Sequence, residues 1–183
     1  MQPPDRVSGH GRVNRTSPPR PRGEAAVSDR TRYRSVVDVM VLLHRTDGRV
    51  LLLRRAGAVY AAGLLAPPGG HLEDGETVVA GALREVDEEV GVTIAPADLE
   101  FCHLVHHRSP EGEARLGLVF TAQRWSGEPR NREPGKCSAL VWANPSQPPP
   151  DCVPYTAAVL DRFCSGALLS THGWPTTRAG GAA

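Results

Sequence analysis

Features that would indicate a membrane, secreted or zinc-binding protein are missing from this sequence. No apolar run approaches the roughly 20 residues of a membrane-spanning helix, and the N-terminus lacks the apolar stretch of a secretory signal. The 4 cysteines form no CxxC pair and no Cys/His spacing typical of a zinc module, so we expect reduced, packed thiols. By elimination, we expect a cytoplasmic protein that does not interact with a membrane.

An excess of charge of either sign is missing as well. The formal net charge is +1, from 21 Lys and Arg against 20 Asp and Glu. No global electric field therefore draws the chain to nucleic acid, and we expect no nucleic-acid partner. Nearly all basic residues are arginine, and Lys136 is the one lysine. An anionic substrate would have to be recognised locally.

The length of 183 residues predicts one domain with tails. Residues 1–34 are rich in Arg and Pro and poor in apolar side chains, so we expect a disordered arm. Two other interpretations of the arm stay open: a nucleic-acid tether, or a start assigned too early, with Val27 as the true start. We expect the domain to occupy residues 35–168 and a C-terminal tail to occupy residues 169–183, with its end disordered.

The hydrophobic pattern predicts mostly strands and two helices. We expect strands over residues 36–44, 50–53, 64–66, 100–107, 116–123 and 138–143, and helices over residues 77–90 and 154–164. The turn residues Thr46, Asp47 and Gly48 predict that the first two strands form an antiparallel pair. The segment 109–113 predicts a second hairpin between the fourth and fifth strands.

The helix expected over residues 77–90 has two different faces. Its apolar residues at helical spacing predict a buried stripe that consists of Val79, Leu83, Val86 and Val90. Glu85, Glu88 and Glu89 stand at i, i+3 and i+4, so their carboxylates project from one side. Like charges this close repel one another, and a hard divalent cation with oxygen ligands would remove that penalty. We therefore expect Mg²⁺ or Mn²⁺ as the cofactor, although a run of charges on a helix is more often a solvated face.

The residues around these glutamates distinguish the two interpretations. They follow the spacing Gly-x5-Glu-x7-Arg-Glu-Val-x-Glu-Glu-x-Gly-Val, with the specified positions occupied by Gly70, Glu76, Arg84, Glu85, Val86, Glu88, Glu89, Gly91 and Val92. This pattern is the Nudix box, and the chain resembles the Nudix hydrolases, most nearly their MutT-like branch, over about residues 35–166. The resemblance implies an α/β/α sandwich with a mixed central sheet, in which the box forms a loop, a helix and a second loop.

The resemblance also implies roles for the residues of the box. The metal ligands would be the Gly69 carbonyl and the carboxylates of Glu85, Glu88 and Glu89. Glu85 and Glu88 are both candidates for the general base that polarises the attacking water, and the sequence does not rank them.

Other residues of the box are expected to support that site. Arg84 could orient a glutamate or contact phosphate, and with Glu76 it would brace the loop against the helix. Gly70 would allow a close approach of the backbone, and Gly91 would end the helix.

Four residues outside the box are further candidates. Arg54 and Arg55 end a strand that would face the box, so we expect one of them to contact phosphate. Glu133, in a loop before the last predicted strand, is a candidate substrate-binding residue, and the resemblance also allows it to be a metal ligand or base. Asp151, together with Tyr155, would lie where MutT-like enzymes contact the base. The histidines do not match a zinc site, and we interpret them as structural or substrate-side residues.

The reaction implied by the resemblance is attack of water on phosphorus in a nucleoside diphosphate linked to another group. We expect a nucleoside triphosphate to give the monophosphate and pyrophosphate. ADP-ribose or another sugar nucleotide remains an alternative substrate, and a non-catalytic nucleotide sensor is an alternative of another class. The complete Arg-Glu-x-x-Glu-Glu core argues against the sensor. Aromatic residues make up 5% of the chain, so few could stack on a base, and we expect broad base specificity. A homodimer stays open.

Overall fold

The structure is a computed structural model that describes residues 33–175 of the chain. Most of the predicted N-terminal arm and the end of the predicted tail, residues 1–32 and 176–183, lie outside the described residues. Within the described part, no helix combines the length and the apolar character that crossing a membrane requires.

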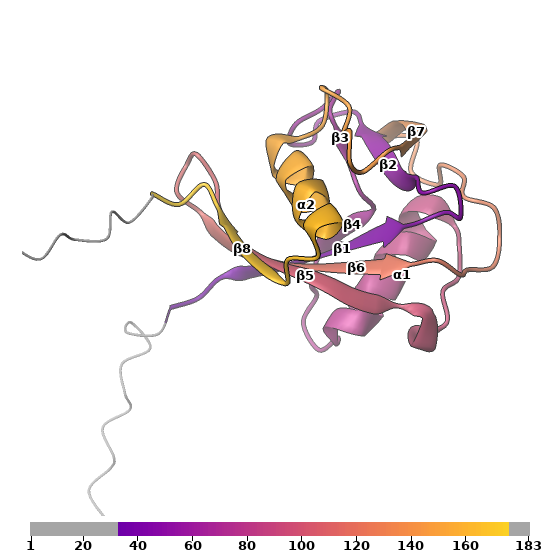
Figure 1. Cartoon of the computed structure of the whole chain (residues 1–183), viewed down its shortest axis with the longest axis horizontal. Helices are drawn as coiled ribbons and strands as arrows, with labels where there is room; N and C mark the ends of the chain where they lie inside the picture. The colour runs from indigo at the N-terminus through magenta and orange to yellow at the C-terminus, as the bar shows by residue number, and fades with distance from the viewer. Residues whose placement is uncertain (1–32, 176–183) are drawn as a thin grey trace, which may run out of the picture. The chain divides into compact units, whose positions relative to one another are not determined.

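Eight strands and two α-helices follow one another along the described residues (Figure 1). In chain order they are β1 (Val36–Leu43), β2 (Val50–Arg55), β3 (Leu65–Ala66), β4 (Gly69–His71), α1 (Val78–Val90), β5 (Glu100–Arg108), β6 (Ala114–Ala122), β7 (Cys137–Ala143), α2 (Pro154–Ser165) and β8 (Leu169–His172). A short 3-10 helix (Pro96–Asp98) precedes β5.

The strands form two sheets. The larger sheet has the order β4-β1-β6-β5-β8, and the smaller has the order β3-β2-β7. In the larger sheet β1 pairs in parallel with β6, and β5 with β8, whereas β1 with β4 and β5 with β6 are antiparallel. The expected mixed central sheet is therefore confirmed.

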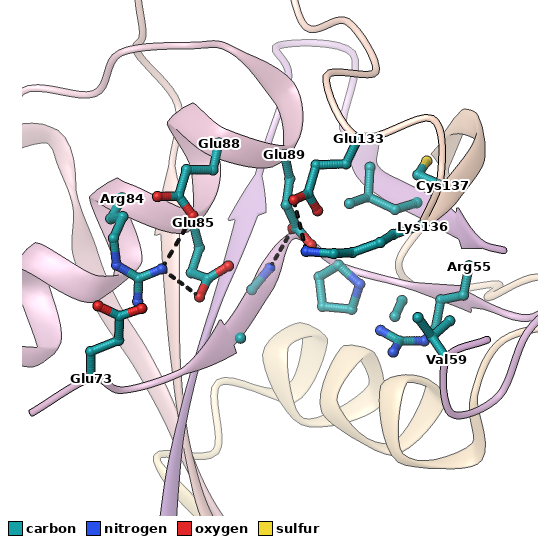
Figure 2. A pocket seen from close by; sticks show the side chains of 15 residues that line it. Arg55, Val59, Glu73, Arg84, Glu85, Glu88, Glu89, Glu133, Lys136 and Cys137 are labelled. Carbon is teal, nitrogen blue, oxygen red and sulfur yellow. Dashed lines mark hydrogen bonds and ion pairs between the residues drawn. The ribbon is translucent and has the colours of Figure 1, made fainter. Parts of the chain in front are cut away.

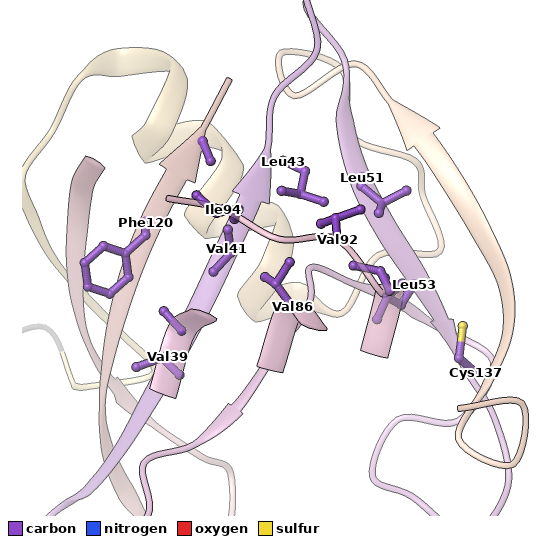
Figure 3. Close-up of a cluster of buried hydrophobic side chains, with 13 residues drawn as sticks. Val39, Val41, Leu43, Leu51, Leu53, Val86, Val92, Ile94, Phe120 and Cys137 are labelled. Carbon is purple, nitrogen blue, oxygen red and sulfur yellow. The ribbon is translucent and has the colours of Figure 1, made fainter. Parts of the chain in front are cut away.

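The two helices cover opposite faces of the strands. Alternate residues of β1 enter two different hydrophobic clusters, because successive side chains of a strand point to opposite faces. Val39 and Val41 join the cluster that contains Val86 of α1 (Figure 3). Met40, like Leu42, joins the cluster that contains Val159 of α2. This arrangement confirms the α/β/α sandwich and explains why β1 is apolar over consecutive positions.

The predicted pairing of the first two strands is wrong. Only His44 and Val50, next to the turn, form an antiparallel bridge, and beyond it β1 and β2 enter different sheets. The turn itself follows the prediction, with Gly48 at φ 80°. Both strands bury both faces, so each is flanked by partners distant in sequence, and turn chemistry alone could not reveal those partners.

The predicted end of the domain at residue 168 also needs correction. Residues 169–172, expected to begin a tail, form β8 at the edge of the larger sheet. His103 of β5 contributes to holding this segment, because its ring nitrogens hydrogen-bond the Ala167 carbonyl at 2.6 Å and the Ser170 hydroxyl at 2.8 Å. The strand is short and polar, so its pattern did not indicate pairing.

Helix α1 follows its prediction closely, apart from one core residue. Thr77 caps the N-terminus by accepting a hydrogen bond from the Ala80 backbone, and Gly91 ends the helix in the left-handed conformation at φ 69°. Val79 was expected in the buried stripe but is 37% exposed, whereas Ala82 is fully buried. The helix is therefore rotated slightly from the predicted orientation.

Candidate active site

The Pro-Gly-Gly turn brings strand β4 close to both β1 and α1. Gly69 lies at φ 153°, and a Cβ on it would be 2.2 Å from the carbonyl oxygen of Val39 in β1. A glycine is therefore required for β4 to approach β1 this closely. The Gly69 backbone N–H donates a hydrogen bond to Glu89 Oε2 at 2.9 Å, which ties the turn to α1.

Gly70 leaves space for the side chain of Glu85. A Cβ at this position would lie 2.3 Å from Glu85 Oε1 and 2.6 Å from its carboxyl carbon. The carboxylate of Glu85 therefore packs directly against the Gly70 backbone. This contact explains why the box has a glycine at position 70, since any side chain there would displace the carboxylate of Glu85.

Arg84 braces the loop before α1. Its guanidinium donates to both carboxylate oxygens of Glu76, at 2.7 and 3.1 Å, and to the His71 carbonyl at 3.3 Å. The same group donates to Glu85 at 2.8 Å and to Glu88 at 3.3 Å (Figure 2). The hydrogen bonds from Arg84 hold the pKa of Glu76 below its usual value, so this carboxylate stays ionised. Arg84 thus connects the loop to the glutamates of the helix.

A cavity of about 310 Å³ lies beside α1 and contains most of the predicted site. Five carboxylates line it, and they belong to Glu73, Glu85, Glu88, Glu89 and Glu133. The cationic side chains that line it are Arg55, Arg84 and Lys136. With all of these groups ionised the cavity has a formal charge of −2, which is the charge that one divalent cation would balance.

The environment of Glu89 disfavours the ionised form of its carboxylate. Burial raises the pKa of this carboxylate to about 7. The hydrogen bond from the Gly69 N–H lowers the pKa, but its effect is smaller than that of burial. The neighbouring carboxylates of Glu85 and Glu133 raise it further. A carboxylate in this position is half protonated near neutral pH and would gain from a nearby cation.

The loop before β7 brings Glu133 to the cavity. The backbone N–H groups of Arg130 and Arg132 donate to the Val90 and Glu89 carbonyls at the end of α1, each at 3.0 Å. Asn131 uses its side chain inside the loop, where it donates to the Cys137 carbonyl at 2.6 Å. Glu133 is thereby left facing the cavity. The resemblance implied a glutamate of this loop as a candidate.

Cationic side chains engage three of the cavity carboxylates. Among residues 33–175, no three His, Cys, Asp or Glu side chains converge closely enough to hold a metal ion. Arg84 engages Glu85 and Glu88, and Lys136 engages Glu133 at 2.8 Å. The donor chemistry nevertheless fits a hard divalent ion, because the side chains of Glu85, Glu88, Glu89 and Glu133 and the backbone at Gly69 line one cavity and offer oxygen ligands.

The two predicted arginines of β2 lie in different places. Arg55 lines the cavity and donates through Nε to the Tyr60 carbonyl at 2.7 Å. Arg54 instead forms an ion pair with Asp151 at 2.7 Å and donates to the Gly63 carbonyl at 2.8 Å. Among the described residues, Arg54 and Asp151 do not line this cavity or the larger one described below. Arg55 therefore lies at the site, whereas Arg54 and Asp151 pair with each other.

A second cavity of about 590 Å³ adjoins the first and shares Arg55, Gly69 and Gly70 with it. Tyr155 lines this larger cavity from the first turn of α2, near the ring of His107 at a centroid distance of 4.5 Å. Burial raises the pKa of Tyr155 and lowers that of His107, so both are neutral near pH 7.

Several residues that line the two cavities were not predicted from the sequence. In the larger cavity these are Asp38, which pairs with His71 Nδ1 at 2.6 Å, and Arg115, 3.6 Å from the same carboxylate oxygen. In the smaller cavity they are Glu73 and Lys136. A signal was present for Asp38, which interrupts an otherwise apolar strand. No such signal marks Arg115, Glu73 and Lys136. In the sequence they cannot be distinguished from ordinary charged surface residues.

The chain is similar in sequence to known proteins. The sequence profile of the NUDIX domain matches residues 34–163. The 8-oxo-dGTP diphosphatase of Escherichia coli (strain K12) is 31% identical over 118 residues, which are 63% of this chain and 89% of that protein. The ADP-ribose pyrophosphatase of Methanocaldococcus jannaschii is 33% identical over 82 residues, which are 45% of this chain and 47% of that protein.

The fold is also similar to a solved structure. A MutT NUDIX hydrolase from Burkholderia pseudomallei superposes with a TM-score of 0.64 at 30% identity, covering 71% of this chain and 98% of that chain. A family profile that matches residues 34–163, a complete Nudix box over residues 70–92 and three box glutamates on one cavity lead to the same conclusion: this chain belongs to the Nudix hydrolase family and is MutT-like.

Proposed function

We propose that this protein hydrolyses a diphosphate bond in nucleoside diphosphate-linked substrates, with Mg²⁺ or Mn²⁺ as the cofactor. The observation that carries this proposal is the placement of Glu85, Glu88 and Glu89 on one cavity that opens beside a larger one. The smaller cavity suits a metal ion with phosphate, and the larger one has the volume for the group attached to the diphosphate.

The residues that would hold the ion are those whose oxygens line the smaller cavity. They are the box glutamates, with Glu133 from the loop and the Gly69 carbonyl as further donors. A bound divalent ion supplies positive charge to the phosphate oxygens and lowers the pKa of a bound water. Glu89 fits a ligand role, because burial raises the pKa of its carboxylate and a nearby cation would favour the ionised form.

The general base is Glu85 or Glu88 in this proposal. Glu85 is the more buried of the two, with 13% of its side chain exposed against 54% for Glu88. Both accept a hydrogen bond from Arg84, which would orient whichever carboxylate takes the proton from water. Arg55 would contact the phosphate chain, because it lies where the two cavities meet.

The substrate we propose is a nucleoside triphosphate that gives the monophosphate and pyrophosphate. The name of the E. coli relative, 8-oxo-dGTP diphosphatase, supports this choice, since the similarity covers 89% of that protein. ADP-ribose is a second candidate, supported by the name of the Methanocaldococcus jannaschii relative over 47% of its length.

The test is an assay of the full chain with a panel of nucleoside triphosphates, ADP-ribose and sugar nucleotides, each with Mg²⁺ and with Mn²⁺. Release of pyrophosphate from a triphosphate, abolished by EDTA and reduced at least tenfold in the Glu85→Gln variant, is the expected result. Turnover of ADP-ribose alone would favour the second candidate. Nucleotide binding by calorimetry without turnover of any compound would show that the protein is a sensor and overturn the proposal.

A further inference from the structure

Lys136 is the one lysine of the chain, and the fold places it at the metal-binding side of the smaller cavity. Its Nζ lies 2.8 Å from Glu133 Oε1. Figure 2 shows the ammonium group beside the carboxylates of both Glu133 and Glu89. The ammonium therefore lies where a cation is needed to balance buried negative charge.

Lys136 differs from Arg84, which also engages glutamates of the smaller cavity, in how its side chain is held. Arg84 donates to Glu76, Glu85, Glu88 and the His71 carbonyl, and 23% of its side chain is exposed. The side-chain ammonium of Lys136 has one hydrogen-bonded partner in the described part of the chain, Glu133, and 66% of the side chain is exposed. A flexible four-carbon stem and a single ion pair allow the ammonium to move.

The positions of the two cavities indicate which part of a substrate the Lys136 ammonium would contact. Arg55 lines both cavities, whereas Lys136 lines the smaller one and not the larger. With the nucleoside in the larger cavity, Arg55 would meet the phosphate nearest the nucleoside. Lys136 would then meet the phosphates farthest from it.

We propose that Lys136 is an exchangeable counter-cation. It neutralises Glu133 before a divalent ion arrives, and it turns to the terminal phosphates of the substrate once the ion has taken over that carboxylate. The inference rests on the proposed function, because it requires a divalent ion and a phosphate chain in the smaller cavity. It adds a substrate-positioning role for a residue that the Nudix box does not include.

A single lysine makes the exchange directly observable. Reductive methylation with ¹³C-formaldehyde keeps the positive charge and gives one side-chain NMR signal, which its absence from the Lys136→Met variant identifies. We expect Mg²⁺ alone to shift this signal as the ion pair with Glu133 opens, and inorganic pyrophosphate added with Mg²⁺ to shift it again. Calorimetry on the same sample measures whether Mg²⁺ and pyrophosphate bind.

The outcomes separate this inference from the proposed function. Binding of Mg²⁺ and pyrophosphate in the calorimeter with an unchanged lysine signal would overturn the role of Lys136 and leave the proposed function intact. Absence of Mg²⁺ binding would overturn both.

Variants give an independent measurement. Lys136→Met should raise the affinity for Mg²⁺ in the absence of nucleotide by about threefold or more, because a competing cation is lost. It should weaken inhibition by pyrophosphate and raise KM for a triphosphate by about tenfold, with Lys136→Arg recovering part of the loss. Arg124→Met is the matched control, since that arginine is 81% exposed and pairs with Asp98 away from the cavity. Weaker Mg²⁺ binding in Lys136→Met with unchanged pyrophosphate inhibition would contradict the proposal.

Discussion

Glu89 provides a quantitative test of the electrostatics of this site. In the metal-free protein its pKa rises from 4.5 to about 7, chiefly because of burial. The folded state then binds a proton more tightly than the unfolded state between these two pH values, so stability falls as the pH rises through that window and levels off above it. One pKa unit corresponds to about 1.4 kcal/mol, so ionised Glu89 costs the folded protein about 3 kcal/mol above pH 7.

Glu89→Gln should remove this cost, because the amide is neutral and its oxygen can still accept the Gly69 N–H. We expect the variant to be more stable than the wild type by about 2 to 3 kcal/mol at pH 8 in EDTA, and nearly equal to it at pH 4.5. For a domain of this length, that difference corresponds to a rise in Tm of roughly 5 to 10 °C. Urea unfolding at the two pH values measures it.

Glu88→Gln is the matched control, since that side chain is 54% exposed on the same helix. It should not give the gain in stability at pH 8 in EDTA that is expected for Glu89→Gln, because its carboxylate is exposed to solvent. Saturating Mg²⁺ should stabilise the wild type at pH 8 but stabilise Glu89→Gln much less, with at least a tenfold loss of affinity. If Glu89→Gln is no more stable than the wild type at pH 8 without metal, burial of this carboxylate is not a cost and the argument for its role as a ligand fails.

Three further substitutions test other parts of the site. Gly69→Ala should lower the free energy of unfolding by about 2 kcal/mol or more, measured by urea unfolding, because its Cβ would clash with the β1 backbone. Gly70→Ala should shift only a side-chain carboxylate, so its melting temperature should stay near that of the wild type while kcat/KM falls at least tenfold. Arg55→Ala should raise KM for a triphosphate more than Arg54→Ala does, since Arg54 lines neither cavity in the described part; equal effects in steady-state kinetics would count against this assignment.

The part of the candidate site that could be predicted consists of residues close together in the sequence. Gly70, Glu76 and Arg84 contact one another, or their neighbours in the box, within one loop and one helix. Their spacing in the sequence therefore determines how they lie relative to one another in the folded chain. Glu133 was predicted only through the resemblance, because its approach to the box depends on hydrogen bonds between the loop before β7 and the end of α1.

Other predictions depended on distant contacts and succeeded less well. Arg54 and Arg55 are adjacent in β2 and could not be distinguished by sequence, yet one pairs with Asp151 and the other lines the cavity. Asp151 was expected near the base, but its carboxylate is engaged by Arg54. Which arginine faces the cavity depends on how β2 pairs with β7, including a register shift between residues 54 and 55.

The sequence by itself determined the local structure of this protein. Capping by Thr77, the left-handed end at Gly91 and the positions of the box glutamates depend on interactions within a few residues, so they follow from spacing. The tertiary structure alone decided which strands pair and which side chains share a cavity. Strands that bury both faces carry no local sign of their partners, and the acidic helix meets Arg55 and Lys136 only because the chain folds back over long distances.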